Sequence, residues 1–234
     1  MSHSTHLAYT ERDMTPHIEI IRKNGTSRLY KAGTSLFYQG EFPRHGVLLT
    51  KGAVRAYTIA SSGEERTIGF YTAGDLLPIA WLLDQVGISL FHYVALSEVR
   101  ALRFSKEDFD RTILGDPVAL KSLFTNLSRD YSAAMLRING LGQSRADEKI
   151  AFTLYYLAFR YGTLLPDGRH EIKLRLPHVV IASMVGLSRE STTKALRSLQ
   201  RKGIISYSRG VYTVNKSSLE HYVGEDIYQS LELA

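Results

Sequence analysis

No cysteine occurs among the 234 residues of the chain. The chain therefore can form no disulfide, no thiolate-bound zinc site and no cysteine-ligated iron–sulfur cluster. It also lacks any run of eighteen apolar residues, so the sequence predicts no membrane-spanning segment. The N-terminal stretch lacks the apolar core of a signal peptide. We expect residues 1–16 to form a mobile arm and the protein to be cytoplasmic.

Motifs that carry out catalysis are also missing. No Gly-x-Ser-x-Gly elbow, phosphate-binding loop or paired-carboxylate site stands out. A metal-binding cupin would need clustered ligands, but His45 and His92 are isolated, with no His-x-His pair and no third ligand at a fitting spacing. We therefore expect no metal, no cofactor and no enzymatic activity.

Positive charge is present but unevenly distributed. The formal net charge is +6. The segment from Arg175 to Lys216 contains eight positive residues, opposed only by Glu190, so its own net charge is +7 and the rest of the chain is near neutral. A basic module joined to a near-neutral one is typical of a nucleic-acid-binding domain attached to a second domain. Charge alone is equally compatible with a solvated basic face.

The basic segment has the pattern of two helices joined by a tight turn. The spacing predicts a first helix from Pro177 to Val185, a left-handed turn at Gly186, and a second helix capped by Ser188. The second helix has an apolar face made of Ala195, Leu196 and Leu199, with charged residues on its other faces. This is the layout of a helix-turn-helix DNA-binding motif, and an ordinary pair of amphipathic helices is the alternative.

The residues after Lys202 predict a β hairpin. Gly203 ends the second helix, and the alternating run IISYSRGVYTV has its turn at Arg209-Gly210. Such a hairpin would be the wing of a winged helix. Arg209 at its tip is placed to contact a phosphate, although a solvated arginine fits the pattern equally well. We assign no function to residues 217–234.

Residues 17–115 predict a sandwich or barrel of short antiparallel strands. Glycines recur at intervals of 7, 12, 11 and 11 residues, between strand-like runs such as VLLTKG, AVRAYTIA and RTIGFY. Ser62-Gly63 fits a hairpin turn between two of these runs.

A long helix is predicted to begin at Asp116-Pro117, with the aspartate as its cap. Apolar residues then alternate at spacings of four and three, which is a heptad seam and indicates a coiled-coil homodimer. A helix buried on its own domain is the alternative. We expect Gly140 and Gly142 to end this helix and form a hinge before a new helix over 146–161. The residues of the seam are Leu120, Phe124, Leu127, Tyr131, Ala134, Ile138 and Leu141.

The run VGLSRESTTKALRSLQRKGII resembles the recognition segment of the CRP/FNR family of bacterial transcription regulators. Ser191 and Lys194 depart from the family's usual Thr and Arg. A second resemblance, to the cyclic-nucleotide-binding jelly roll of the same family, lies in the order of four motifs. These are a Gly-x6-Gly-Glu turn, the run Lys51–Arg55, SGEE and GDLL. The resemblance spans roughly residues 28–216. The positions that match the recognition segment in residue type and spacing are Ser188, Arg189, Glu190, Leu196 and Leu199.

The resemblance implies an α+β fold in three parts: an antiparallel β jelly-roll sensor over 17–115, a dimerisation helix over 116–142 and a winged helix-turn-helix over 143–234. It implies a homodimeric, sequence-specific regulator that binds palindromic double-stranded DNA. It also implies contact with RNA polymerase through exposed loops such as 61–66 and 164–169. Family members that sense oxygen use a cysteine-bound cluster, which this chain cannot form.

The resemblance also assigns roles to residues at the DNA interface. Arg189 would pair with a guanine edge, and Glu190 would accept from a cytosine amino group. The full base-reading set is Arg189, Glu190, Thr193 and Lys194. The set expected to contact phosphate is Ser188, Ser191, His178, Arg197 and Arg209.

Family members that bind cyclic AMP carry a Gly-Glu pair after the Gly-Asp turn and an Arg-Ser pair about ten residues later. This chain has Pro78-Ile79 at the first place and Ile88–Leu90 at the second, with no cation between Arg66 and Arg100. The hydroxyl pair that reads adenine is replaced by Ala134-Met135. A buried phosphate would lack charge-assisted hydrogen bonds here, so we expect no response to cyclic AMP.

Without these polar groups, the pocket expected in the sensor domain has an apolar lining, which would suit an apolar effector or no effector. Its residues are Leu77, Ile79, Trp81, Leu127 and Tyr131. Two alternatives stay open: a haem-based gas sensor, with His92 or a histidine of the arm as axial ligand, and a ligand-independent DNA-binding protein. The sequence names neither the effector nor the operator.

Overall fold

A computed structural model describes residues 15–223 of the chain. The described residues divide into two compact units, one over 15–128 and the other over 129–223. The predicted N-terminal arm, its histidines and the end of the C-terminal tail lie largely or wholly outside the described residues. No helix within residues 15–223 has the length and apolar character needed to cross a bilayer.

The first unit consists mainly of short antiparallel strands, as the glycine spacing predicted. They form two four-stranded sheets, with the orders β1-β8-β3-β6 and β2-β7-β4-β5. The elements are α1 (Thr15–Asn24), β1 (Thr26–Tyr30), β2 (Ser35–Phe37), β3 (Gly46–Lys51), β4 (Val54–Ile59), β5 (Glu65–Tyr71), β6 (Leu76–Leu77), α2 (Ile79–Leu82), β7 (His92–Ala95), β8 (Val99–Phe104), α3 (Lys106–Phe109) and the π-helical segment η1 (Asp110–Leu114).

The core of this unit follows from strand alternation. Successive side chains of a strand point to opposite faces of its sheet. In β6, Leu76 packs in a cluster with α1, α3 and η1, whereas Leu77 packs in a second cluster with β2, β4 and β7. The two clusters therefore lie on the two faces of the sheet that contains β6.

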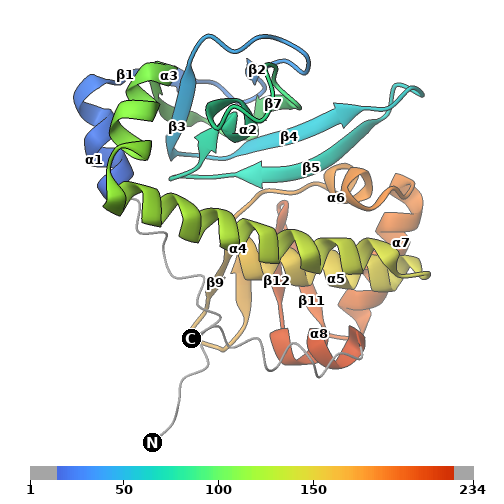
Figure 1. Ribbon diagram of the computed structural model, residues 1–234. Helices are drawn as coiled ribbons and strands as arrows, with labels where there is room; N and C mark the ends of the chain where they lie inside the picture. Colours follow the sequence, from blue (N-terminus) through green and yellow to red (C-terminus); the bar gives the residue numbers. More distant parts are fainter. Residues whose placement is uncertain (1–14, 224–234) are drawn as a thin grey trace, which may run out of the picture. The chain divides into compact units, whose positions relative to one another are not determined.

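The hairpin of β4 and β5 confirms the predicted turn at Ser62-Gly63 (Figure 1). The backbone N–H of Ala60 donates to the carbonyl of Glu64 at 2.9 Å. Gly63 has φ +85°, a left-handed conformation that a β-carbon would strain.

The long helix α4 (Pro117–Gly142) begins where the sequence predicted (Figure 1). Asp116 caps it, because its Oδ1 accepts from the backbone N–H of Ala119 at 2.7 Å. The helix contributes its first turns to one unit and its last turns to the other. Gly142 ends the helix as predicted, but Gly140 does not, because it lies inside the helix and is buried.

Two faces of α4 differ in burial. One face is buried and includes Ala119, Leu123, Asn126, Ala133, Leu136 and Gly140. The predicted seam lies on another face, where Leu120 and Leu127 are half-buried and Ala134 is exposed. The larger residues of the seam are also exposed: Phe124 66%, Tyr131 66%, Ile138 60% and Leu141 37%.

The second unit is a helical domain with a small sheet. Helix α5 (Ala146–Tyr161) has the predicted bounds and forms much of the core, with Ile150, Leu154 and Leu157 fully buried. The four strands pair in the order β11-β12-β10-β9. The other elements are β9 (Gly162–Leu164), β10 (His170–Ile172), α6 (His178–Val185), α7 (Arg189–Arg201), β11 (Ile205–Ser208), β12 (Val211–Val214) and α8 (Lys216–Val223).

Polar contacts fasten the short helix α8 to this domain. The Tyr222 hydroxyl donates to Asp147 Oδ2 at 2.6 Å, and Lys202 Nζ donates to the Tyr222 hydroxyl at 3.1 Å. Within α8 itself, Lys216 forms an ion pair with Glu220 at 3.5 Å. Two of the basic residues in the 175–216 segment therefore have partners within the domain.

Candidate DNA-binding interface

The two helices predicted as a helix-turn-helix are α6 and α7. Helix α6 begins at His178, one residue later than predicted, because Pro177 has an extended backbone with ψ 157° and serves as the N-cap. Gly186 ends α6 with φ +68°, and its N–H donates to the carbonyl of Ala182. The left-handed glycine turn between the helices is confirmed.

Ser188 caps α7 as predicted. Its Oγ accepts from the backbone N–H of Ser191 at 3.1 Å, which satisfies one of the free donors at the helix start. One face of α7 packs into the domain core, with Thr192, Ala195, Leu196 and Leu199 buried. The opposite faces are left to solvent.

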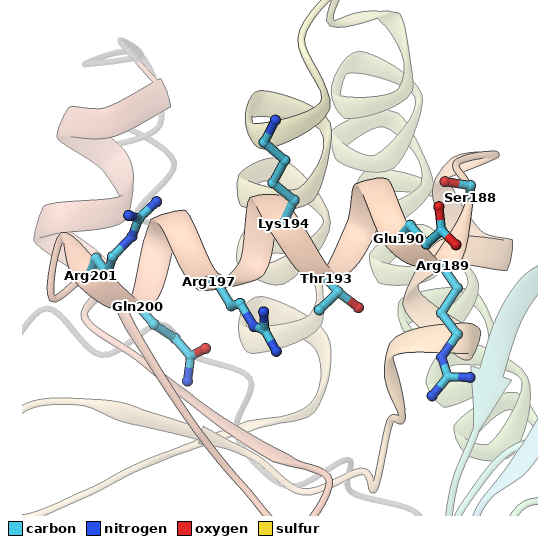
Figure 2. A pocket seen from close by; sticks show the side chains of 8 residues that line it. All are labelled: Ser188, Arg189, Glu190, Thr193, Lys194, Arg197, Gln200 and Arg201. Atoms are coloured by element: carbon cyan, nitrogen blue, oxygen red, sulfur yellow. The ribbon is translucent and has the colours of Figure 1, made fainter.

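The solvent side of α7 carries two rows of polar side chains (Figure 2). One row is Arg189, Thr193, Arg197 and Gln200, and the other includes Glu190, Lys194 and Arg201. Both rows follow the helical repeat, since positions three or four apart lie on one face. Together with Ser188, these seven residues line one concave surface.

The cations of α7 are not neutralised by any of the residues that the structure describes. Arg189, Lys194, Arg197 and Arg201 are exposed, and among residues 15–223 none of them forms an ion pair. A row of unpaired cations on an exposed helix is suited to phosphate and to guanine edges. This arrangement gives the domain a basic face on α7.

His178 is held between α7 and the hairpin. Its Nδ1 lies 3.0 Å from the Thr193 hydroxyl, and its ring centroid lies 4.9 Å from that of Tyr207. Burial lowers the pKa of His178, and the nearby charges of Arg189 and Arg197 lower it further. Thr193, which the sequence predicts to read a base, therefore contacts His178, which the sequence predicts to contact a phosphate.

The hairpin predicted as a wing is formed by β11 and β12. Ser208 pairs with Val211, which leaves Arg209 and Gly210 as the two turn residues with φ +50° and +88°. Positive φ at both central residues is the requirement of a type I′ hairpin turn. Arg209 is exposed, and the carbonyl of Gly210 accepts from the Leu176 N–H at 2.7 Å, which ties the turn to the segment before α6.

The concave surface includes two residues that our sequence analysis did not place in the site, Gln200 and Arg201. Their positions follow Arg197 by three and four residues. Helical spacing alone could therefore have added them to the set.

The residues predicted to line an effector pocket are not brought together as one group. Ile79, Trp81 and Leu127 are partly buried against the cluster that contains Leu76. Leu77 faces the other side of its sheet, in the core between the sheets. Tyr131 is exposed and belongs to the second unit.

In this chain the segment that corresponds to the Arg-Ser pair of cyclic AMP binders forms hydrogen bonds that stabilise the fold. Ser89 is fully buried, and its Oγ donates to the carbonyl of Phe91 at 2.9 Å. Its backbone N–H donates to the Glu41 carbonyl at 2.8 Å. These contacts join two loops of the jelly roll.

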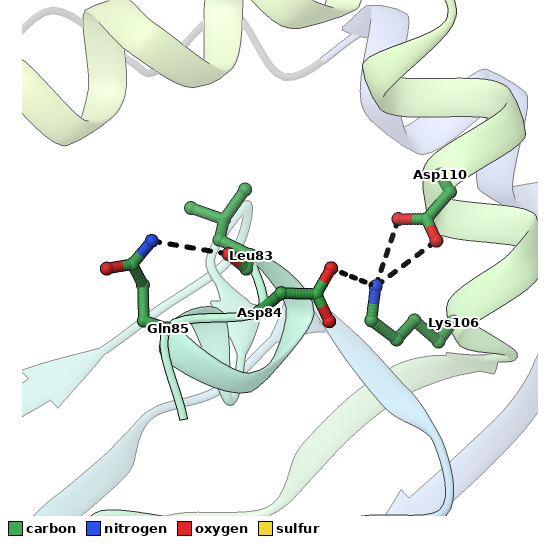
Figure 3. Close-up of polar contacts among 5 residues, drawn as sticks. All are labelled: Leu83, Asp84, Gln85, Lys106 and Asp110. Carbon is green, nitrogen blue, oxygen red and sulfur yellow. Dashed lines mark hydrogen bonds and ion pairs between the residues drawn. The ribbon is translucent and has the colours of Figure 1, made fainter. Parts of the chain in front are cut away.

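The end of α2 is fastened to α3 and η1 (Figure 3). Lys106 Nζ donates to Asp84 Oδ2 at 2.8 Å and to the Asp110 carboxylate at 3.1 Å. Both hydrogen bonds raise the pKa of Lys106, with Asp84 the larger cause. Asp84 has φ +55°, a left-handed conformation that aspartate adopts more readily than most residues other than glycine.

His92, the candidate haem ligand within the described residues, is engaged by protein groups. Its Nδ1 accepts from the backbone N–H of Gln39 at 3.3 Å, and its ring stacks on Tyr57 with centroids 5.0 Å apart. Across residues 15–223, no three His, Asp or Glu side chains are grouped in a way that could hold a metal ion.

Comparison with known proteins agrees with this geometry. Residues 27–134 match the family model of the cyclic nucleotide-binding domain, and residues 148–222 match that of the Crp-like helix-turn-helix domain. The "Cyclic AMP receptor protein" of Thermus thermophilus is 28% identical over 82% of this chain and 85% of its own length. The "Global nitrogen regulator" of Synechococcus elongatus is 24% identical over 84% of this chain and 91% of its own.

Solved structures share the fold. A mutant of CooA from Carboxydothermus hydrogenoformans has a TM-score of 0.74 at 18% identity and covers 93% of this chain and 98% of its own. A CRP-family transcriptional regulator of Thermus thermophilus has a TM-score of 0.66 at 21% identity, covering 85% and 97%.

Fold and site together define a transcription regulator in which an antiparallel β domain precedes a helix-turn-helix DNA-binding domain. Within that class, the chain belongs to the CRP/FNR family.

Proposed function

We propose that this protein is a cytoplasmic, homodimeric regulator that binds a palindromic DNA operator through α7 and does not respond to cyclic AMP. The observation that carries the proposal is the face of α7. Four cations lie there in rows at helical spacing, without ion pairs to other described residues. Phosphates and guanine edges are the groups that such cations bind.

Within α7 the roles divide by position. Arg189 is the first residue of the helix, and the N-terminal residues of a recognition helix are those that meet base edges in the major groove. We propose that Arg189, Glu190 and Lys194 read bases. Arg197 and the wing residue Arg209 would bind phosphate. Thr193, which is bonded to His178, is better suited to positioning than to reading a base.

The exposed seam of α4 supports a homodimer. Phe124, Tyr131 and Ile138 each have about two-thirds of their surface in solvent, and they recur at heptad spacing. Apolar residues in such a row are stabilised when a second copy of the helix covers them. A two-fold dimer would place two recognition helices on half-sites about one helical turn, roughly 34 Å, apart.

Selection of duplexes from a random DNA library tests this proposal. We expect the recovered sequences to share two inverted half-sites with a constant spacing. Arg189→Ala should cost about 1–3 kcal/mol on the selected site and relax one guanine position. Recovery of single half-sites, or an equal loss by Arg189→Ala on selected and random DNA, would contradict it.

The sensor is proposed to take an apolar effector or none. In cyclic AMP binders of the family an Arg-Ser pair binds the phosphate, but the corresponding place here offers the buried Ser89, whose hydroxyl donates to the carbonyl of Phe91. A buried phosphate without a cation would lose its charge-assisted hydrogen bonds. The names of the relatives do not decide the ligand, because one is a "Cyclic AMP receptor protein" and others are named as nitrogen regulators.

Calorimetry with cyclic AMP tests the sensor separately from the DNA interface. We expect no heat of binding at micromolar nucleotide and no change in DNA affinity. Micromolar binding together with a gain in DNA affinity would overturn the proposal for the sensor and leave that for α7 intact.

Contact with RNA polymerase is proposed from family membership alone, through loops such as 164–169.

A further inference from the structure

We propose that Arg137 and Gly140 are positioning residues that hold the helix-turn-helix against the last turns of α4. Through these contacts they would set the half-site spacing that the dimer recognises. The inference rests on the proposed function and adds to it the residues that determine spacing.

The last turns of α4 belong to the same compact unit as the helix-turn-helix. One face of these turns is buried, with Ala133, Leu136 and Gly140 inward, while Tyr131 and Ile138 of the seam remain exposed. The same turns therefore present a face to their own domain and a different face to a second copy. The contacts that hold the buried face of these turns to their own domain would therefore also determine where α7 lies relative to the dimer axis.

Arg137 makes a direct link from α4 to the helix-turn-helix. Its Nη2 donates to the backbone carbonyl of Met184 at 3.3 Å. Met184 lies in the last turn of α6, two residues before Gly186, where the carbonyl end of the helix favours a positive charge. Burial lowers the pKa of Arg137, so the guanidinium depends on partners such as this carbonyl.

Gly140 is where α4 approaches α5 most tightly among the glycines of the helix. A β-carbon built on Gly140 would lie 2.6 Å from Cβ of Phe152, closer than such atoms approach in proteins. A β-carbon on Gly142 would meet no atom within 4 Å. Alanine at position 140 would therefore push the two helices apart, whereas alanine at position 142 would not.

An ion pair adds a second tie between α4 and α5. Arg160 is almost fully buried, and its guanidinium lies 2.5 Å from the carboxylate of Asp130. Asp130 directly precedes the seam residue Tyr131 in α4. Three contacts along the same turns of α4 thus hold it to the DNA-binding domain. In a two-fold dimer, a change in any of them would shift both recognition helices symmetrically and alter their separation.

The experiment compares four variants of the full chain: Gly140→Ala with its matched control Gly142→Ala, and Arg137→Met with its conservative partner Arg137→Lys. Fluorescence anisotropy would measure affinity for duplexes that carry the selected half-sites at the selected spacing, and at spacings one and two base pairs longer or shorter. We expect wild type, Gly142→Ala and Arg137→Lys to prefer one spacing. Gly140→Ala and Arg137→Met should lose about tenfold in affinity for the duplex with that spacing, or 1.4 kcal/mol. Their loss of affinity for duplexes with the other spacings should be much smaller.

A merely structural defect would lower affinity for all spacings in the same proportion, so that outcome would overturn the proposal. So would an unchanged spacing preference in both Gly140→Ala and Arg137→Met, with sedimentation showing them dimeric. If the wild-type protein itself showed no preference for paired half-sites, the proposed function would fail instead. If Gly140→Ala did not fold, the Arg137→Met and Arg137→Lys pair would still decide the question.

Discussion

Arg209 has a left-handed backbone at φ +50°, although asparagine or glycine would occupy this turn position with less strain. A residue with a β-carbon in this region costs about 1–2 kcal/mol relative to a right-handed conformation. Strain that persists at an exposed tip is compatible with a functional role for the side chain. The same residue thus combines a local cost in stability with a position suited to phosphate.

Replacing Arg209 with glycine should separate these two effects. We expect Arg209→Gly to raise the free energy of unfolding by up to about 1 kcal/mol, because the left-handed turn is no longer strained. DNA affinity should fall on specific and random sequences alike, with a salt slope lower by about one per protomer. Urea unfolding and anisotropy titrations measure the two quantities. Arg209→Lys, which keeps both charge and strain, is the control, and unchanged DNA binding by Arg209→Gly would exclude the phosphate contact.

His178 should make DNA binding dependent on pH. In the free protein, burial and the charges of Arg189 and Arg197 hold its pKa below the ordinary 6.5, so it is neutral at pH 7. The groups that face it are those two arginines, Thr193 and Tyr207. The negative charge of bound DNA would offset the positive charges of the two arginines and raise the pKa of His178, so binding would take up a proton.

Affinity should therefore rise as pH falls from 7.5 towards 5.5. Anisotropy titrations over this range, at constant ionic strength, give the number of protons taken up from the slope of log affinity against pH. In His178→Asn the slope should be smaller. A wild-type affinity that did not change with pH, or an equal slope in the variant, would show that His178 is not coupled to DNA.

At the scale of whole elements, α4 has faces that differ in burial, as the proposed dimer requires. The heptad pattern is apolar on the seam, but the residues that its own chain buries lie on another face. Val118 is also apolar and 64% exposed, yet it lies off the heptad positions. The helix therefore offers a matched pair of exposed apolar sites, one within the seam and one outside it.

This pair tests the dimer interface without disturbing the core. Ile138→Lys would place like charges opposite each other across the two-fold axis, so we expect the dimer to weaken markedly at micromolar concentration. Val118→Lys, equally exposed but off the seam, should leave the dimer intact. Sedimentation equilibrium measures both. If Ile138→Lys remained as tightly dimeric as wild type, the interface would lie elsewhere on the molecule.

At the scale of the whole molecule, two half-buried histidines should limit stability in acid. Arg103 Nη2 donates to Nδ1 of His45 at 2.8 Å, and burial, with the charge of Arg103, lowers the pKa of His45 to about 4. The pKa of His170 in the other unit is also lowered, mainly by burial and secondly by Lys216. In both units the fold thus favours the neutral imidazole.

The sign of the pH effect follows from these shifts. The folded pKa of His45 lies below the unfolded value near 6.5, so stability is full above pH 6.5 and falls as pH drops from 6.5 towards 4. Because the ring is only half-buried, we expect a loss of about 1–2 kcal/mol from this residue. Urea unfolding at pH 7 and pH 4.5 measures the loss. His45→Asn, which keeps an acceptor for Arg103, should reduce it, and an undiminished loss would assign acid sensitivity to other groups.

By itself, the sequence determined those features that depend on neighbours along the chain. Helix caps at Asp116 and Ser188, the left-handed turn at Gly186 and the wing turn at Arg209-Gly210 are local, since each is set by a few consecutive residues. The periods of the apolar residues predicted the strands, the long helix and the helix-turn-helix. Most of the recognition face could be predicted for the same reason, because α7 displays its side chains at a regular spacing.

Only the tertiary structure decided features that depend on partners far apart in the chain. Lys202 counted towards the charge of the basic segment, but its Nζ donates to the hydroxyl of Tyr222, twenty residues further along the chain in α8. Gly140 and Gly142 look alike in sequence, yet Phe152 lies against only the first. In each case the outcome depends on packing in three dimensions, which periodicity along the chain does not contain.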